Sequence, residues 1–328
     1  MRTKIIIFFL VVIFIPILAS ATTISPPIIE IELDPGQSGR YFLTLFNETD
    51  QPLYLDGYIE IFESKGERGE VEIVSPSVAY QSLSWLKLPT ESIDLRPGDI
   101  AKVPLTVDIP QTAEVGGYYL AAMWETSLGP KVADSQIGIS SRVGTLIFLR
   151  VKGEAEEDIS IIDFGLSVDT DFYSHLPVAY TSRLSNLGTV HLKPAGSIVI
   201  KNIFGRVTAV LPFNPDKRNI LPQSNRQFDN VWQRRLGVSD DSDVWSDFLN
   251  EITQFSFGRY SAQLDLEYGD SRQRAVSDPV TFYVIPWRII SVIIIFIVLM
   301  MIFKRIKKQD TRKQEINKKQ KTKLKIVI

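Results

Sequence analysis

Few side chains in this sequence have the type and spacing that an active site requires. The 328 residues contain no cysteine and two histidines, His175 and His191, which do not have the spacing of metal ligands. No serine lies in a Gly-x-Ser-x-Gly elbow. We therefore expect no enzymatic activity, no cofactor and no metal, and we interpret His191 as a structural histidine at the start of a strand.

The densest acidic cluster has two interpretations. It comprises Asp240, Asp241, Asp243 and Asp247. Converging carboxylates suit calcium, but this segment lacks the glycine and the distal glutamate of an EF-hand loop. Acids are also favoured in the first turn of a helix, where they face the positive end of its dipole. We favour the helix interpretation, and calcium binding by residues 240–247 stays open.

Aromatic side chains are the remaining candidates for binding. We predict that Trp85, Tyr118 and Tyr119 contact a partner, either by stacking on sugars or by anchoring a protein. Core packing competes with this prediction at every aromatic position. It is favoured for Trp124, which shares a strand face with Tyr118.

The apolar pattern predicts the strands that must carry these residues. Apolar and polar residues alternate in residues 100–109 and 258–268, which is typical of antiparallel strands with one buried face. Turn residues such as Pro35-Gly36 and Pro97-Gly98 separate the strands. Asn47-Glu48-Thr49 matches a glycosylation sequon, but we interpret it as a turn at the end of a strand.

An acidic segment without large apolar residues, residues 152–158, is predicted to link two domains. The predicted fold class is all-β: two tandem Ig-like β-sandwich domains, residues 25–151 and 159–285, followed by a single transmembrane helix. A helical insertion is expected near residues 242–255. Its apolar face, expected to cover an open edge or end of the sandwich, comprises Trp245, Phe248, Leu249 and Ile252.

The two ends predict export and anchoring. Residues 1–21 have the basic start, apolar run and small-residue site of a signal peptide, and residues 286–303 form the predicted membrane helix. Residues 304–328 contain eleven Lys or Arg and two acidic residues, although the net charge of the whole chain is −2. Basic segments next to a membrane helix remain on the cytoplasmic side of the membrane. We therefore expect a single-pass cell-membrane protein with extracytoplasmic domains and a cytoplasmic tail. Nucleic-acid binding by the tail is disfavoured.

Short motifs in the first domain resemble one bacterial family. They are Asp34-Pro35-Gly36-Gln37, Ser82-Leu83-Ser84-Trp85-Leu86, Leu95-Arg96-Pro97-Gly98 and Gly116-Gly117-Tyr118-Tyr119-Leu120. The chain in this respect resembles the WxL-interacting protein family, whose N-terminal domain is assigned to peptidoglycan binding. The resemblance implies a surface adaptor that binds cell-wall polymer and a secreted protein. The acidic ectodomain departs from this picture, because it disfavours anionic wall polymers.

The functional prediction is therefore a non-enzymatic, membrane-anchored cell-surface adaptor. Its partner is expected to be peptidoglycan, another cell-wall polymer, or a surface or envelope protein, bound through the faces and edges of the β-sandwiches. One alternative is a carbohydrate-binding adhesin, which predicts exposed, coplanar aromatic rings. Another is an assembly chaperone for secreted subunits, which predicts an unpaired apolar edge strand in the first domain.

Overall fold

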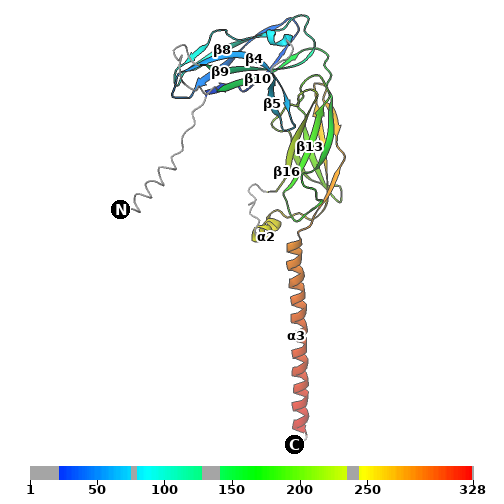
Figure 1. The fold of residues 1–328 in the computed structure, drawn as a ribbon. Helices are drawn as coiled ribbons and strands as arrows, with labels where there is room; N and C mark the ends of the chain where they lie inside the picture. The colour runs from blue at the N-terminus through cyan, green and yellow to red at the C-terminus, as the bar shows by residue number, and fades with distance from the viewer. Residues whose placement is uncertain (1–21, 75–79, 128–140, 235–243, 327–328) are drawn as a thin grey trace, which may run out of the picture. The chain divides into compact units, whose positions relative to one another are not determined.

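The computed structural model describes residues 22–74, 80–127, 141–234 and 244–326, and the chain divides into two compact units. Unit 1 comprises Met1–Ile159, Ser185–Leu192 and Asn219–Arg226, and unit 2 comprises Ser160–Leu184, Lys193–Arg218 and Gln227–Ile328. The predicted fold class is confirmed: paired β-sheets dominate, and one apolar helix follows them (Figure 1). The expected signal peptide lies outside the described residues, and the domain boundaries stay a prediction.

Two sheets face each other in unit 1. The first contains β1 (Thr22–Ser25), β3 (Ser38–Asn47), β8 (Ile100–Asp108) and β6 (Leu86–Lys87), in that order. The second contains β2 (Ile28–Leu33), β10 (Arg142–Val151), β9 (Gly116–Ser127), β4 (Leu53–Lys65) and β5 (Glu70–Val74), with β7 (Ile93–Leu95) also paired to β4. The chain passes from the first sheet to the second between β1 and β2, where the Ser25–Pro26 peptide is cis.

Alternation places one face of each strand in the core. On β3, Leu43 and Leu45 are fully buried, and on β8 Leu105 and Val107 are fully buried, while the residues between them are partly exposed. This confirms the predicted buried face of residues 100–109. Burial of apolar area removes it from water and is the main stabilising term for such a sandwich.

Unit 2 holds most of two further sheets. The smaller contains β11 (Ile159–Leu166), β13 (Val178–Asn186) and β16 (Ser224–Trp232). The larger has the order β12 (Phe172–Tyr173), β19 (Val280–Val284), β17 (Gly258–Tyr268), β14 (Ala195–Asn202) and β15 (Val207–Phe213), and β18 (Gln273–Val276) also pairs with β17. The predicted alternation in residues 258–268 is confirmed, because Ala262, Leu264 and Leu266 are fully buried.

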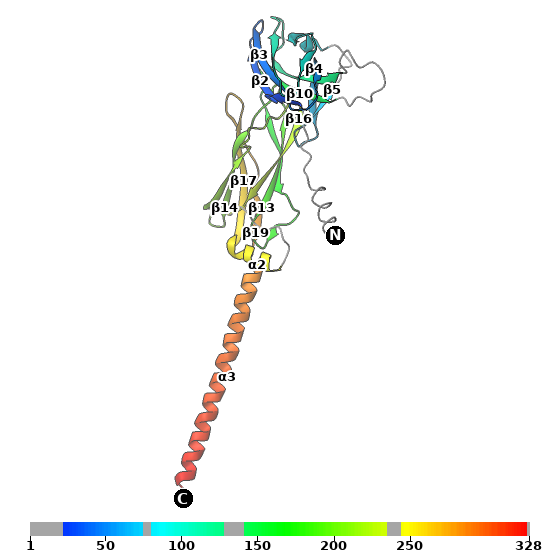
Figure 2. The same ribbon diagram turned by 90° about the vertical axis from the view of Figure 1, so that its left-hand side faces the viewer.

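Two helices follow the strands of unit 2. Helix α2 (Val244–Thr253) lies within the predicted range, although Ser242 and Asp240, Asp241 and Asp243 are outside the described residues. Helix α3 (Trp287–Ile326) begins three residues after the end of β19 and continues through the basic segment (Figure 2). Its part Trp287–Lys308 is long and apolar enough to cross a membrane and is not buried.

The orientation of α2 differs from the prediction. Leu249 and Ile252, expected to cover the sandwich, are 56% and 51% exposed, whereas Glu251 is fully buried. Glu251 is paired there with Arg288 of α3 and accepts the Ile289 N–H, which compensates the cost of burying its carboxylate. Leu249 and Ile252 of the predicted apolar face are therefore exposed, whereas Phe248 is half-buried.

Candidate functional site

The three predicted partner-binding residues lie in two different places. Trp85 is 6% exposed and belongs to the core of unit 1, where its ring centroid is 4.7 Å from that of Tyr118. The Tyr118 hydroxyl donates a hydrogen bond to the Glu114 carbonyl oxygen over 3.0 Å, and burial raises the pKa of Tyr118. Trp85 thus presents little ring surface to a partner, and the binding role of this pair stays a prediction.

Tyr119 lies on the opposite face of β9. It packs edge-to-face against Phe62 and Phe148, and its hydroxyl is 3.2 Å from Nδ1 of His191, which belongs to the same unit. Burial raises the pKa of Tyr119 well above the ordinary range. His191 also contacts the Phe148 ring, with centroids 5.2 Å apart, which supports its interpretation as a structural histidine. A binding role for Tyr119 stays a prediction.

The other sequence candidates are accounted for by packing. Trp124 is 1% exposed, which confirms its core role, and Trp232 is 3% exposed. Asn47 is fully buried; its Nδ2 donates to the carbonyl oxygens of Gln51 and Leu95, and its Oδ1 accepts from the Thr49 N–H. This confirms the strand-end turn. The described residues include no group of three His, Cys, Asp or Glu that could hold a metal ion.

An open sheet edge in unit 2 is the strongest candidate for binding. β15 is the last strand of the six-stranded sheet and pairs only with β14 among the strands that the structure describes. It carries no charged residue, and Val207 and Val210 are each 57% exposed. Two other edge strands contain charges that discourage pairing: Glu70 and Glu72 in β5, and Arg226 and Asp229 in β16. The edge strands β1 and β12 are uncharged as well, but they are only four and two residues long, and short edges are poor templates for pairing.

A polar hollow of about 380 Å³ lies on the same sheet, one strand in from this edge. Its lining residues come from β14, β17 and β18: Ala195, Gly196, Ser197, Asp265, Glu267 and Arg274. Gly196 and Ser197 pair directly with Phe213 and Pro212 of β15. Gly196 also lets two strands approach, because a Cβ there would collide with the Asp265 carbonyl oxygen and lie 2.7 Å from the Leu266 Cα.

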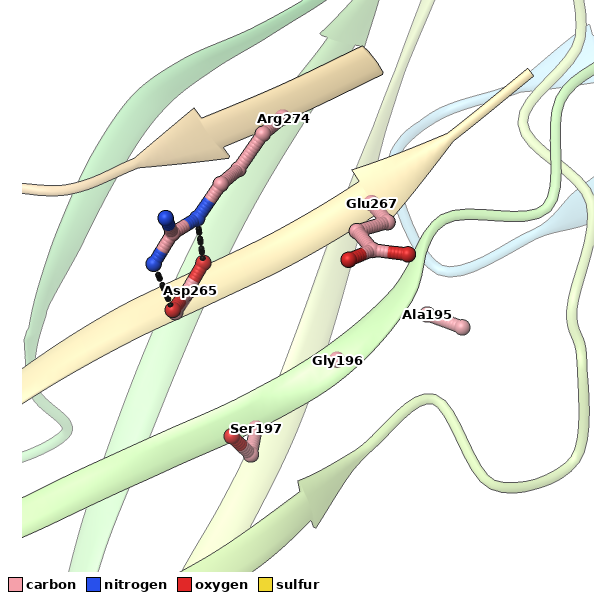
Figure 3. Close-up of a pocket in the computed structure, with 6 residues that line it drawn as sticks. All are labelled: Ala195, Gly196, Ser197, Asp265, Glu267 and Arg274. Atoms are coloured by element: carbon pink, nitrogen blue, oxygen red, sulfur yellow. Dashed lines mark hydrogen bonds and ion pairs between the residues drawn. The ribbon is translucent and has the colours of Figure 1, made fainter. Parts of the chain in front are cut away.

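One bidentate ion pair, between Arg274 and Asp265, lies in the hollow. Arg274 reaches from β18 to β17, where its Nε is 2.7 Å from Oδ1 of Asp265 and its second nitrogen contacts Oδ2 (Figure 3). These hydrogen bonds from Arg274 lower the pKa of Asp265, and Asp265 in turn raises the pKa of Arg274. Glu267 lies on the same strand with its carboxylate turned away from Arg274 (Figure 3), so the hollow is lined by two carboxylates and one guanidinium and has a net negative charge.

The sequence contains a signal for this edge. Residues 207–213, VTAVLPF, form a β-type run without charge, and Pro212 within it indicates an edge strand, because proline cannot donate to a ladder. The hollow had no comparable signal. Asp265 and Arg274 meet only because β17 and β18 form a hairpin in register.

Comparisons with known proteins give a likeness in structure only. No family model matches the chain, and no curated protein matches it. Among solved structures, the class 5 fimbriae chaperone CfaA is 13% identical, with 78% of this chain and 98% of that chain covered at a TM-score of 0.38. The Escherichia coli chaperone DraB is 9% identical, with 81% and 97% covered and a TM-score of 0.34.

A third structure of this kind is the CsuC–CsuE chaperone–tip adhesion subunit complex of Acinetobacter baumannii. It is 11% identical, with 80% of this chain and 98% of that chain covered and a TM-score of 0.33. Likeness at this level does not identify a function. The resemblance to the WxL-interacting family stays a prediction.

Proposed function

We propose that this chain is a non-enzymatic, membrane-anchored protein-binding module that accepts an extended segment of a surface or envelope protein as an added strand at β15. The observation that carries the proposal is the open, uncharged edge of β15, with Val207 and Val210 each 57% exposed. In this proposal α3 is a single-pass anchor, the sheets are extracytoplasmic, and the basic end of α3 is cytoplasmic.

Strand addition suits the chemistry of this edge. An edge strand presents backbone N–H and C=O groups that a partner strand can satisfy, and these main-chain bonds supply affinity without fixing the sequence of the partner. Exposed Val207 and Val210 add apolar area that association removes from water. The net negative hollow beside β14 favours a partner segment that carries a basic side chain.

An assembly chaperone for secreted subunits is the second candidate function. The feature expected for it, an unpaired apolar edge strand, is present, but it lies in unit 2 rather than in the first domain. A chaperone and a permanent adaptor would use the edge in the same way. They differ in whether the partner leaves β15 when it meets its next subunit.

The carbohydrate-adhesin alternative has less support. Trp85, Trp124 and Trp232 are all buried, so their rings offer no platform to a sugar. The stacked rings of the exposed Phe172 and the half-buried Tyr283, with centroids 5.1 Å apart, are the best candidate among the described residues. Binding to cell-wall polymer likewise stays a prediction. Incubation of the chain with protein-free cell walls tests it directly.

The proposal is tested by placing a charge on the edge. The full chain in detergent or nanodiscs is incubated with envelope proteins and, separately, with protein-free walls. The variant Val210→Lys should weaken capture of the envelope partner at least tenfold, about 1.4 kcal/mol, because a lysine on an edge strand opposes pairing. Amide exchange of β15 should slow in the wild-type complex.

The matched control is Val71→Lys, which adds the same charge to the edge strand β5 at another exposed valine. Capture should be unchanged in this variant. If Val210→Lys binds as the wild type does, the β15 proposal is wrong. Retention on bare walls alone would instead support the wall-binding prediction.

A further inference from the structure

Several parts of unit 2 meet at the end from which α3 leaves. In the six-stranded sheet, Gly258 pairs with Val284 and Tyr260 with both Phe282 and Asn202. The turn between β14 and β15 therefore lies at the same end of the sheet as the last residue of β19. Helix α2 ends just before β17 begins, so it belongs to this end as well (Figure 2).

This end exposes large apolar side chains in two separate segments. The hairpin turn contributes two, and α2 with its connection to β17 contributes four. Their exposed fractions are 65% for Ile203, 83% for Phe204, 56% for Leu249, 51% for Ile252, 46% for Phe255 and 61% for Phe257. Apolar side chains that gather on one surface mark an interaction site.

Helix α2 is fixed to the first turn of α3 by its acidic face. Arg288 binds Asp247 over 2.6 Å and Glu251 over 3.2 Å. The second carboxylate oxygen of Glu251 accepts the Ile289 N–H over 3.0 Å, which caps the start of α3. These contacts hold α2 at the level where the apolar part of α3 begins.

The two faces of α2 have opposite character. Asp247 and Glu251 are four residues apart and share the face that contacts α3. Leu249 and Ile252 are three residues apart and share the opposite, exposed face. An amphipathic helix of this kind, lying beside a membrane span, places its apolar face about 5–10 Å into the boundary between headgroups and acyl chains.

We propose that this end of unit 2 is a lipid-binding surface, with α2 and the β14–β15 turn resting in the outer headgroup region of a phospholipid bilayer. The inference rests on the membrane anchor of the proposed function. The surface is continuous with α3, whose apolar stretch begins at Ile289, next to the contacts with α2. The bilayer that surrounds α3 is therefore the partner expected for this surface. Trp287 is 55% exposed at the same level, where tryptophan favours the membrane interface.

Depth-dependent quenching tests the inference, and the absence of cysteine makes single-site labelling direct. Single-cysteine variants of the full chain, Leu249→Cys, Ile252→Cys and Phe204→Cys, are labelled with an environment-sensitive fluorophore. They are reconstituted in phosphatidylcholine vesicles that carry bromine near the headgroup or deep in the acyl chains. Ile297→Cys reports the membrane span. Ser271→Cys lies in the turn that follows β17, whose far end is about 35 Å along the strand from Gly258.

Each outcome is decisive. Shallow bromine should quench the labels at positions 249, 252 and 204, deep bromine should quench the label at 297, and neither should quench the label at 271. Quenching at 297 without quenching at 249, 252 and 204 would overturn the lipid-binding surface while the anchor stands. If the label at 297 is not quenched either, the anchor itself fails, and the inference fails with it.

Discussion

At the scale of single residues, three buried asparagines hold the ends of strands. Asn47, Asn186 and Asn214 each donate from Nδ2 to two backbone carbonyl oxygens and accept a backbone N–H at Oδ1. A buried carbonyl that loses its donor costs about 1–3 kcal/mol, which explains why an amide is required there. Asn47 is therefore structural, and its sequon does not present the side chain to a glycosylating enzyme.

The variant Asn47→Asp tests this role. The shape is kept, but both donated hydrogen bonds are lost and a carboxylate faces two carbonyl oxygens, so we expect the free energy of unfolding to fall by about 3 kcal/mol. Asn202→Asp is the control, because Asn202 uses only Oδ1, as an acceptor from the Phe204 and Arg206 N–H groups. Urea unfolding of the purified chain measures both. Equal stability of the two variants would contradict the assignment.

Gly196 makes a second prediction at this scale. Gly196→Ala pushes a Cβ into the backbone of β17, so we expect a loss of about 2 kcal/mol in the free energy of unfolding. Gly165→Ala on β11 is the control, since no atom lies within 4 Å of the position of its Cβ. That variant should be unchanged or slightly more stable, because alanine restricts the unfolded chain. Thermal unfolding of both variants decides whether close strand approach is what requires glycine.

The sequence alone predicted the packing contacts of few residues. Alternation identified the buried faces, and it identified Trp124 as a core residue. It gave no means of placing Trp85 beside Tyr118, because these residues lie on different elements and meet only in the folded unit. Core and ligand-binding aromatics have the same local pattern, so their exposure depends on the tertiary structure.

At the scale of elements, the strands were predictable and the orientation of α2 was not. The strand pattern is local, since the side chains of neighbouring residues in a strand point to opposite faces of the sheet. The inward face of α2 depends on Arg288, which follows Glu251 by 37 residues, and no local pattern contains that partner. The same limit hid the hollow, whose acids and arginine converge from β17 and β18.

Breaking the contact between α2 and α3 should release α2. Arg288→Met leaves Glu251 buried without its cation; we expect a cost of about 2 kcal/mol, below the usual value for fully buried pairs because the Arg288 side chain is 21% exposed. Amide exchange in α2 should then be roughly 30-fold faster. Lys304→Met removes an equal charge from α3 at the other end of its apolar stretch and should leave α2 protected.

At the scale of the whole molecule, composition predicted the order of parts. Apolar and basic segments at the C-terminal end of the described chain predicted a helix such as α3, and regular alternation predicted the sheets before it. The position of the open edge could not be predicted, because it depends on which strand ends each sheet. That order is a property of topology: β15 follows β14 in the chain but has no further neighbour among the described strands.

The direct passage from β19 into α3 has a mechanical consequence. A pull on a partner strand at β15, directed away from the anchor, is transmitted through the ladders between β15, β14, β17 and β19 to Val284 and then to α3. Because this load runs along the strands, each ladder is sheared with its hydrogen bonds stretched together, eight residue pairs between β14 and β17 alone. The sheet therefore connects α3 directly to β15, the strand at which we propose that the partner segment is added.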